Sequence, residues 1–490
     1  MTISFFSAKN QELCCSLNNI NLHSSYNPSR EAQRFVDTRQ YDFIPAAIIV
    51  TEPCLSYCAS FFRQKFPKSL LICIRYVHDF YKYDYLWDKV FYLDKEKSLS
   101  ESLFNYLGEE KLLKTLFLSW TPGEKPFYNE YLICWNEIKK SVQKSQSVLV
   151  TRSYFAKRWL KNIIKFCRTV NKTTTPLVTD KPVIVCASGR SLESSISCIK
   201  KYRQHFYLLC VSSAISVLSD NAITPDLYLS TDGGYWAKVH LSHHIENNTQ
   251  VPIALSPESA VYSHILDSHT IVPIFYGDGL SQDFYELFPD KMNAYRNGTV
   301  SGTALQLALE LTSNKVYLCG LDLSSNKGYP HSQPNEIEVF SCTRDDRLHT
   351  LETRITPSVF HSASLNIYLD WFNNLDNKEG RIRRLSQNYN YSNKLTNIKD
   401  VDWRYFEQNI SSNASHSDNL YSKINKVCIK NKDIKNIIQN NIDSQRWLRE
   451  LFPLEYILFD RCSDNNEKQK IKEMLTSKAN AIKEELLNDL

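Results

Sequence analysis

The chain has 490 residues, of which 42% are hydrophobic and 23% are charged. This length predicts roughly three domains, and the composition is typical of a globular protein. The net charge of +5 is small and the basic residues are spread along the chain, so the sequence does not favour nucleic-acid binding. No run approaches the roughly 20 apolar residues of a membrane span, and the N-terminus lacks the basic start and long apolar core of a signal peptide. We therefore expect a cytoplasmic protein.

The 14 cysteines favour neither disulfides nor a metal site. The sequence contains no CxxC pair, and Cys186, Cys210 and Cys319 lie inside apolar runs. A free cysteine in such a run behaves as a small hydrophobic residue. We expect these thiols to pack in the core and to bind no metal.

Residues 1–40 are polar and irregular, which predicts a loose N-terminal extension. Residues 41–170 then alternate strand-like apolar runs with helical spacing, the pattern of a small α/β domain. The predicted strands are residues 44–50, 70–76 and 89–93, and the predicted helices are residues 54–66, 98–116, 128–148 and 153–170. The polar segment NKTTTPLVTDKP, residues 171–182, is the predicted linker to the next domain.

Residues 181–330 hold nine of the twelve glycines, so tight turns are concentrated there. Apolar runs recur through this region, at residues 183–187, 206–214, 226–232, 252–256, 270–276 and 315–324. Helix-like segments separate several of them, which is typical of a parallel α/β sheet. We predict a central Rossmann-like domain over residues 181–385. The helical spacing that follows predicts a helical C-terminal domain over residues 386–490, packed on the α/β part or on a partner.

The first strand of the central domain runs through a small turn into a helix, in the sequence KPVIVCASGRSL at residues 181–192. The turn consists of Ser188, Gly189, Arg190 and Ser191. Such a joint presents unpaired backbone N–H groups and the positive end of a helix dipole at one place, which suits a phosphate. Most strand–turn–helix joints, however, contain Gly or Ser for turn geometry alone.

Polar side chains also follow other strands of this domain. Ser212 and Ser213 follow the second apolar run, Asp232 ends the third, and Asp322 lies in the last. Ligands of open α/β sheets bind outside the carboxyl ends of the strands. We therefore expect these side chains to gather around one crevice.

A second turn of the same kind lies at residues 297–302, NGTVSG. Its candidate residues are Asn297, Gly298, Ser301 and Gly302. The segment ALQLALEL that follows is apolar nearly all round and is therefore predicted to be a buried helix. Its N-terminal amides would face the same crevice, and the alternative is an ordinary capped helix start.

His331 lies in a polar loop, NKGYPHSQPNE, just beyond the last strand. Histidine can accept a proton near neutral pH, so His331 is the candidate general base. We expect the loop to be mobile enough to admit a large acceptor. The alternative is a surface histidine without a role in chemistry.

The segments ASGRSLESSI, VSSAISVLSDNAITPDLYLSTDGG, NGTVSGTALQLALEL, VYLCGLDLS and YPHS together resemble the central domain of the Maf (motility accessory factor) flagellin glycosyltransferases. The resemblance covers about residues 150–390. That domain is also similar to the MptE-like hydroxymethylpterin diphosphokinases and, more distantly, to bacterial sialyltransferases. The most specific piece is Pro225 and Asp226, a strand, and then Asp232. In the first turn, Arg190 stands where the family has proline.

The resemblance implies transfer of a nonulosonic acid, a sialic-acid-like sugar, from a CMP-activated donor to Ser or Thr hydroxyls of flagellin. On this reading His331 is the catalytic base, with Asp232 next, and no metal or other cofactor is required. The nucleotide would contact Ser188, Gly189, Arg190, Ser191, Ser212, Ser213, Asn297, Gly298, Ser301, Gly302 and Asp322. CMP is a good leaving group, so the protein must chiefly position the donor, stabilise the phosphate and deprotonate the acceptor.

Two other functions stay open. The first is a diphosphokinase of a pterin-like substrate, with Mg²⁺ held by carboxylates such as Asp232 and Asp322; the sequence has no GxxxxGK[ST] loop. The second is a non-catalytic binding or scaffolding protein of flagellar assembly, since Arg190 departs from the family pattern. Metal dependence separates the two enzymes, and any turnover excludes the third function.

Overall fold

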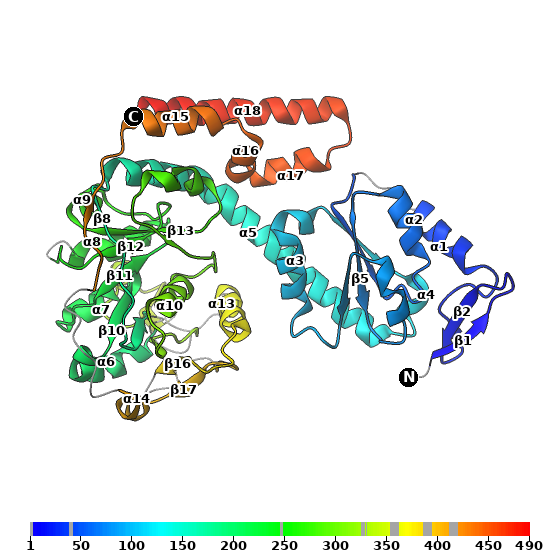
Figure 1. The fold of residues 1–490 in the computed structure, drawn as a ribbon, viewed down its shortest axis with the longest axis horizontal. Coiled ribbons are helices and arrows are strands. Elements are labelled where there is room, and N and C mark those ends of the chain that lie inside the picture. The colour runs from blue at the N-terminus through cyan, green and yellow to red at the C-terminus, as the bar shows by residue number, and fades with distance from the viewer. Residues whose placement is uncertain are drawn as a thin grey trace. The chain divides into compact units, whose positions relative to one another are not determined.

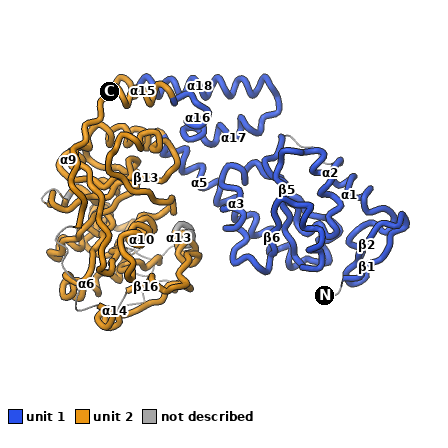
Figure 2. Tube along the Cα trace, in the orientation of Figure 1, with its two compact units in different colours: residues 1–156, 441–485 blue, residues 157–440, 486–490 orange. Residues whose placement is uncertain are grey.

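The computed structural model describes residues 3–38, 43–245, 248–324, 329, 331–352, 362–385, 394–410 and 420–490. The chain divides into two compact units, shown in Figure 2: unit 1 is residues 1–156 and 441–485, and unit 2 is residues 157–440 and 486–490. Both units contain a parallel sheet, which confirms the predicted α/β class (Figure 1). Across the described residues, no helix has the length and apolar character needed to cross a bilayer.

Unit 1 contains a four-stranded parallel sheet in the order β6-β5-β4-β7. Its strands are β4 (Ala47–Thr51), β5 (Leu70–Arg75), β6 (Lys89–Tyr92) and β7 (Thr115–Ser119). All five residues of β4 are buried, as expected of a central parallel strand covered on both faces. The three strands predicted from the apolar runs are confirmed. β7 was not predicted, because helical spacing over residues 98–116 includes the first part of this strand.

The helices of unit 1 follow these strands. They are α2 (Cys58–Lys65), α3 (Leu99–Leu113), the short α4 (Thr121–Glu124), and the C-terminal helices α16 (Gln445–Leu451), α17 (Pro453–Arg461) and α18 (Asn465–Asn488). The ammonium of Lys114 lies 2.6 Å from Asp460 Oδ2, which ties α17 to the residue before β7. The helical character predicted for the end of the chain is therefore confirmed.

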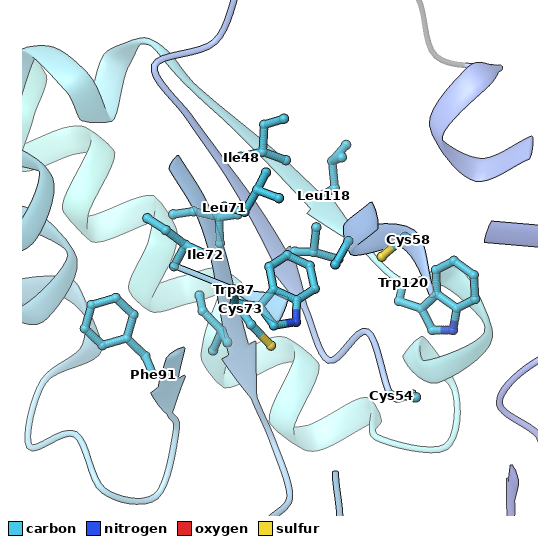
Figure 3. Packing of buried hydrophobic residues seen from close by; sticks show 14 of the residues in the cluster. Ile48, Cys54, Cys58, Leu71, Ile72, Cys73, Trp87, Phe91, Leu118 and Trp120 are labelled. Carbon is cyan, nitrogen blue, oxygen red and sulfur yellow. The ribbon is translucent and has the colours of Figure 1, made fainter. Parts of the chain in front are cut away.

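The core of unit 1 forms where apolar side chains of β4, β5 and β7 meet, as Figure 3 shows for Ile48, Leu71, Ile72 and Leu118. Cys73 is fully buried within this core. All fourteen cysteines are free thiols. Cys186, Cys210 and Cys319, which were predicted to pack in the core, are fully buried in the sheet of unit 2.

The expectation that residues 1–40 form a loose extension is wrong. They contain the antiparallel strands β1 (Ile3–Ser7), β2 (Leu13–Leu17) and β3 (Ile20–Asn21) and the helix α1 (Pro28–Asp37). The polar residues that suggested irregularity lie at the surface, whereas Cys15, Leu17 and Leu22 are buried in the unit 1 core. Helix α1 starts with an ordinary cap, because the Asn27 side chain accepts a hydrogen bond from the Arg30 amide.

Helix α5 (Tyr128–Thr169) is one continuous helix of 42 residues where the sequence predicted two. The division between the units falls within it, after residue 156. The predicted linker, residues 171–182, lies further along the chain. It contributes β8 (Lys172–Thr173) to the sheet of unit 2.

Unit 2 contains an 11-stranded sheet in the order β17-β16-β15-β9-β10-β11-β12-β13-β8-β18, with β14 paired to β13. The central strands are β9 (Val183–Cys186), β10 (Tyr207–Val211), β11 (Leu227–Ser230), β12 (Ile253–Leu255), β13 (Ile271–Phe275) and β15 (Val316–Cys319). Each of the six apolar runs predicted to form a strand contains one of these strands, so the prediction is confirmed. They are mutually parallel, so their carboxyl ends lie at one edge of the sheet.

The outer strands are β14 (Met292–Asn293), β16 (Ile382–Leu385), β17 (Lys399–Val401) and β18 (Asn425–Lys426). β17 and β18 lie within residues 386–490, where the sequence predicted a helical domain. They have two or three residues each, too few to give a strand periodicity. The predicted boundary at residue 386 itself lies outside the described residues.

The helices of unit 2 are α6 (Ser191–Tyr202), α7 (Ile215–Asp220), α8 (Tyr235–Ile245), α9 (Ser263–Ser268), α10 (Val300–Leu311), α11 (Glu336–Cys342), α13 (Ser362–Asn374), α14 (Trp403–Asn409) and α15 (Asn431–Asn441). α10 packs across β15, β9, β10 and β11. It is the buried helix that ALQLALEL predicted, since seven of its residues are buried.

The buried imidazole of His23 predicts a pH-dependent stability of unit 1. His23 is 2% exposed, and burial lowers its pKa to about 3, so the folded state keeps it neutral. The unfolded chain takes up a proton below pH about 6.5, so stability falls as pH drops from 6.5 towards 3, by about 1.4 kcal/mol per pH unit. Native-state hydrogen exchange of β4 and β5 peptides at pH 7 and pH 5 measures this loss.

The variant His23→Gln removes the titrating group while keeping an acceptor for the Leu55 amide, which lies 3.1 Å from His23 Nε2. It should lose less stability between pH 7 and pH 5 than the wild-type chain. The matched control, His78→Gln, removes the other histidine of unit 1 and should keep the steep fall. Equal pH dependence of wild type and His23→Gln would contradict the assignment.

Candidate functional site

The carboxyl edge of the unit 2 sheet brings the predicted residues together. Ser188, Ser212, Asp232 and Asp322 each follow one of the parallel strands β9, β10, β11 and β15. Strand order reverses beside β9, because β10 to β13 lie on one side of it and β15 to β17 lie on the other. Ligands of open α/β sheets bind at such a reversal.

The turn after β9 is held closed by the strand beside it. Asp322 is 4% exposed, and its carboxylate accepts hydrogen bonds from the Ser191 amide at 2.8 Å and from the Ser191 hydroxyl. The Gly189 amide donates to the Gly320 carbonyl at 2.7 Å. A Cβ on Gly189 would lie 2.4 Å from that carbonyl oxygen, so only glycine permits this approach.

These contacts change what the turn can bind. The Gly189 and Ser191 amides, predicted to hold a phosphate, already donate to groups of the protein. Arg190 has a φ of −59°, which lies in the range that proline would fix. The turn therefore has a structural role. The carboxylate of Asp322 occupies the position at the start of α6 where an anionic ligand was expected.

The loop after β15 folds back onto the same turn. Residues Gly189 and His331 form an antiparallel β-bridge. The Ser332 amide and hydroxyl donate to the Ser188 carbonyl at 2.8 and 3.1 Å, and the Ser213 hydroxyl donates to Ser188 Oγ at 2.8 Å. The backbone of residues 331 and 332 is thus paired with the turn after β9. The predicted mobility of the loop stays a prediction, because residues 325–328 and 330 lie outside the described residues.

The imidazole of His331 is half-buried, and its Nδ1 atom is buried without a hydrogen-bond partner in the described part of the chain. Burial lowers the pKa of His331, the nearby charge of Glu338 opposes this shift, and His240 adds to it. The ring is therefore neutral at neutral pH, as a proton acceptor must be.

The second predicted turn is only partly open: the Gly302 and Thr303 amides donate to the Thr299 carbonyl at 3.2 Å, whereas the Val300 and Ser301 amides make no hydrogen bond among the described residues. Thr299, the N-cap residue of α10, makes no side-chain capping hydrogen bond. In its favoured orientation the Asn297 amide donates to the Thr299 carbonyl at 2.8 Å and accepts from the Thr303 amide at 3.0 Å. Gly298 has a φ of +76°, a conformation that favours glycine. A Cβ on Gly302 would lie 2.8 Å from Asn297 Cγ.

Asp232 lies close to this open turn. It is exposed, and its Oδ1 atom accepts a hydrogen bond from the Gly234 amide at 2.8 Å. Burial raises the pKa of Tyr368 on α13, and the charge of Asp232 raises it further. Tyr368 also lies 3.8 Å from the position that a Cβ on Gly298 would take. Tyr368 is therefore near both Asp232 and Gly298, and no sequence pattern marked it.

A partly exposed ion pair supports the same region. The guanidinium of Arg296 donates to both carboxylate oxygens of Glu258, at 2.8 and 2.6 Å, and to Asp278 at 2.6 Å. It also lies 4.5 Å from the ring centre of Tyr276. Burial raises the pKa of Tyr276, whereas the hydroxyl of Thr231 lowers it. These contacts link the residue before the open turn to the ends of β11, β12 and β13.

Among the described residues, no three His, Cys, Asp or Glu side chains are grouped closely enough to hold a metal ion.

Comparison with known proteins agrees with the resemblance read from the motifs. Residues 157–328 match the family described as 6-hydroxymethylpterin diphosphokinase MptE-like. The chain is 28% identical over 313 residues to an uncharacterized protein of Treponema pallidum (strain Nichols), a match covering 64% of this chain and 68% of the relative. These matches confirm the resemblance to MptE-like proteins for the central residues.

The fold is similar to that of a solved structure, the MAf glycosyltransferase from Magnetospirillum magneticum AMB-1. The TM-score is 0.52 at 12% sequence identity, over 98% of this chain and 90% of that chain. The chain therefore has the fold of this glycosyltransferase through almost all of its length, including the parts outside the central residues.

The closed turn predicts that Asp322 stabilises unit 2. Removing its carboxylate with Asp322→Ala leaves the buried Ser191 amide and hydroxyl without their acceptor, which should cost about 1–3 kcal/mol of unfolding free energy. Thermal unfolding measures this loss, with Asp220→Ala, an exposed acidic residue of the same unit, as the control. An unchanged melting temperature together with weakened nucleotide binding would show instead that Asp322 serves a ligand.

Proposed function

We propose that this chain is a glycosyltransferase that moves a nonulosonic acid from a CMP-activated donor to Ser or Thr hydroxyls of flagellin. The observation that carries the proposal is the open start of α10, which lies beside Asp232 at the carboxyl edge of the central sheet. The fold shared with a MAf glycosyltransferase supports it. The proposed acceptor and donor follow from the motif resemblance.

The donor phosphate would lie at the start of α10. The first-turn amides of a helix point at such a ligand and the helix dipole favours its negative charge. Gly298 leaves the backbone uncovered there, Gly302 makes room for the Asn297 side chain that holds the turn, and Ser301 adds a hydroxyl. The carboxylate of Asp232 is placed to accept hydrogen bonds from sugar hydroxyls, because only one of its oxygens accepts the Gly234 amide.

The reaction is a substitution at the anomeric carbon. The acceptor oxygen forms the new bond to that carbon, the bond from the carbon to the phosphate oxygen breaks with its electron pair leaving on CMP, and the acceptor proton passes to a base. Charge develops on the leaving phosphate, which the α10 amides stabilise. His331 and Asp232 are the two sequence-derived candidates for the base. We propose that the transfer needs no metal.

The diphosphokinase is the second candidate function, because residues 157–328 match that family. It would require carboxylates free to bind Mg²⁺ beside the phosphates. Asp322, one of the two carboxylates that the sequence offers, already accepts two hydrogen bonds from Ser191. This observation favours the glycosyltransferase. A scaffolding role without catalysis would show no turnover at all.

We predict that CMP binds this chain equally well with Mg²⁺ and with EDTA, and more tightly than ATP does. Ser301→Asp puts a negative charge at the start of α10 and should weaken CMP binding by at least about tenfold, because it repels the phosphate from the helix amides. Isothermal titration calorimetry measures both affinities. Ser313→Asp, just beyond the other end of α10, adds the same charge and should leave CMP affinity unchanged.

Mg²⁺-dependent ATP binding without a response to CMP would favour the diphosphokinase. Equal CMP affinity in Ser301→Asp and in wild type would place the nucleotide elsewhere. Mass spectrometry of flagellin from cells with and without this chain tests the acceptor. A sugar mass present in both samples would contradict the proposed activity.

A further inference from the structure

Three polar side chains from separate helices meet near His331. Ser216 lies on α7, His240 on α8 and Glu336 on α11. The segments that carry them follow β10, β11 and β15, so all three come from the carboxyl edge of the sheet. His240 is 4% exposed and Ser216 is 3% exposed. None of the three was a candidate site residue in the sequence, and His240 and Glu336 are 96 residues apart in the chain.

The carboxylate of Glu336 is bound on both of its oxygens. His240 Nδ1 lies 2.6 Å from Glu336 Oε2, and the Ser216 hydroxyl donates to Glu336 Oε1. Burial alone would raise the pKa of Glu336, but the hydrogen bonds from His240 and Ser216 outweigh it and lower the pKa. Glu336 is therefore ionised at neutral pH and can only accept hydrogen bonds.

This contact fixes the tautomer of His240. Because the ionised carboxylate of Glu336 accepts only, Nδ1 of His240 must carry the proton, and the neutral ring then has its lone pair on Nε2. Within the described residues Nε2 of His240 makes no hydrogen bond. A carboxylate that holds Nδ1–H in this way also stabilises the imidazolium formed when Nε2 takes up a proton.

The Ser216 hydroxyl donates to Glu336 and not to His240. The three residues are therefore not a nucleophilic triad, in which the imidazole would accept the serine proton. Ser216 instead saturates the second carboxylate oxygen. Two of its helix neighbours, Ile215 and Val217, are buried, so the hydroxyl is held in place by packing.

We propose that His240 is the proton acceptor for the incoming hydroxyl and that Glu336 is its positioning residue. This inference rests on the proposed glycosyltransferase function. As the acceptor oxygen bonds to the anomeric carbon and the bond to the CMP phosphate breaks, the hydroxyl proton passes to His240 Nε2. Glu336 retains its hydrogen bond to Nδ1 and balances the positive charge of the ring.

His331 is less suited to take that proton. No carboxylate hydrogen-bonds to its ring, and its Nδ1 is buried without a partner in the described part of the chain. Burial lowers the pKa of His331, the charge of Glu338 opposes this shift, and the charge of His240 adds to it. His240 differs from His331 in geometry, because a carboxylate holds its Nδ1.

The test uses an extract from cells lacking this chain, which supplies the native donor and unmodified flagellin. Purified full-length variants are added, and mass spectrometry follows the initial rate of sugar incorporation. His240→Gln should slow incorporation by about 10²–10⁴-fold, the usual contribution of a general base, and Glu336→Gln by at least about tenfold. CMP affinity, measured by calorimetry, should stay within twofold of wild type for both variants.

A rescue experiment separates chemistry from packing. In His240→Ala, added imidazole should restore part of the lost rate by taking up the proton in place of the missing ring, which a purely structural histidine would not allow. His264→Gln, an exposed histidine of the same unit, is the matched control and should keep the wild-type rate. Melting temperatures of all variants show whether unit 2 stays folded.

Wild-type rates in His240→Gln would overturn this proposal while leaving the glycosyltransferase intact. So would a 10²-fold loss confined to His331→Gln, or a loss in His240→Ala that imidazole does not restore. A wild-type chain that adds no sugar to flagellin in the extract would instead overturn the proposed function, and this inference with it.

Discussion

The carboxylate of Asp322 connects the two halves of the central sheet at the place where strand order reverses. It comes from the loop after β15 and holds the helix start after β9, through the amide and hydroxyl of Ser191. A buried carboxylate without these donors would be costly, so the two loops are fixed against each other. Gly189 completes the joint, since any side chain there would collide with Gly320. The rest of the edge is arranged around this closed turn.

The amides of the turn after β9 already donate within the protein, so they are not available to an anion. The start of α10 is the other candidate place for the anion. The sequence treats the two turns alike, because both combine small residues with a following helix. The structure separates them by their hydrogen bonds: the Gly189 and Ser191 amides both donate to groups of the protein, whereas the Val300 and Ser301 amides at the start of α10 make no hydrogen bond among the described residues. The fixed turn instead anchors His331 by the bridge to Gly189, and the loop that leads on from it carries Glu336 to His240. We therefore assign donor binding and proton transfer to different elements at the carboxyl edge of the unit 2 sheet.

Sequence patterns predicted the six central strands because each is buried on both faces and reads as a continuous apolar run. They also placed Ser188, Asp232 and Asp322 at strand ends. They could not show that Asp322 faces Ser191, or that His240 meets Glu336, since these contacts join residues far apart in the chain. The short strands β8, β17 and β18 were missed because two or three residues carry no periodicity. Residues 3–37 were misjudged because their surface is polar although Leu17 and Leu22 are buried.

Hydrogen exchange with and without CMP tests most directly whether the carboxyl edge of the unit 2 sheet holds the donor nucleotide. We predict that CMP slows exchange at the start of α10, around residues 297–303, and in the segment after β11 that contains Asp232. Exchange in the strands β4 and β5 of unit 1 should not change. Protection confined to unit 1, or to the turn at residues 188–191 alone, would show that the donor nucleotide does not bind at this edge.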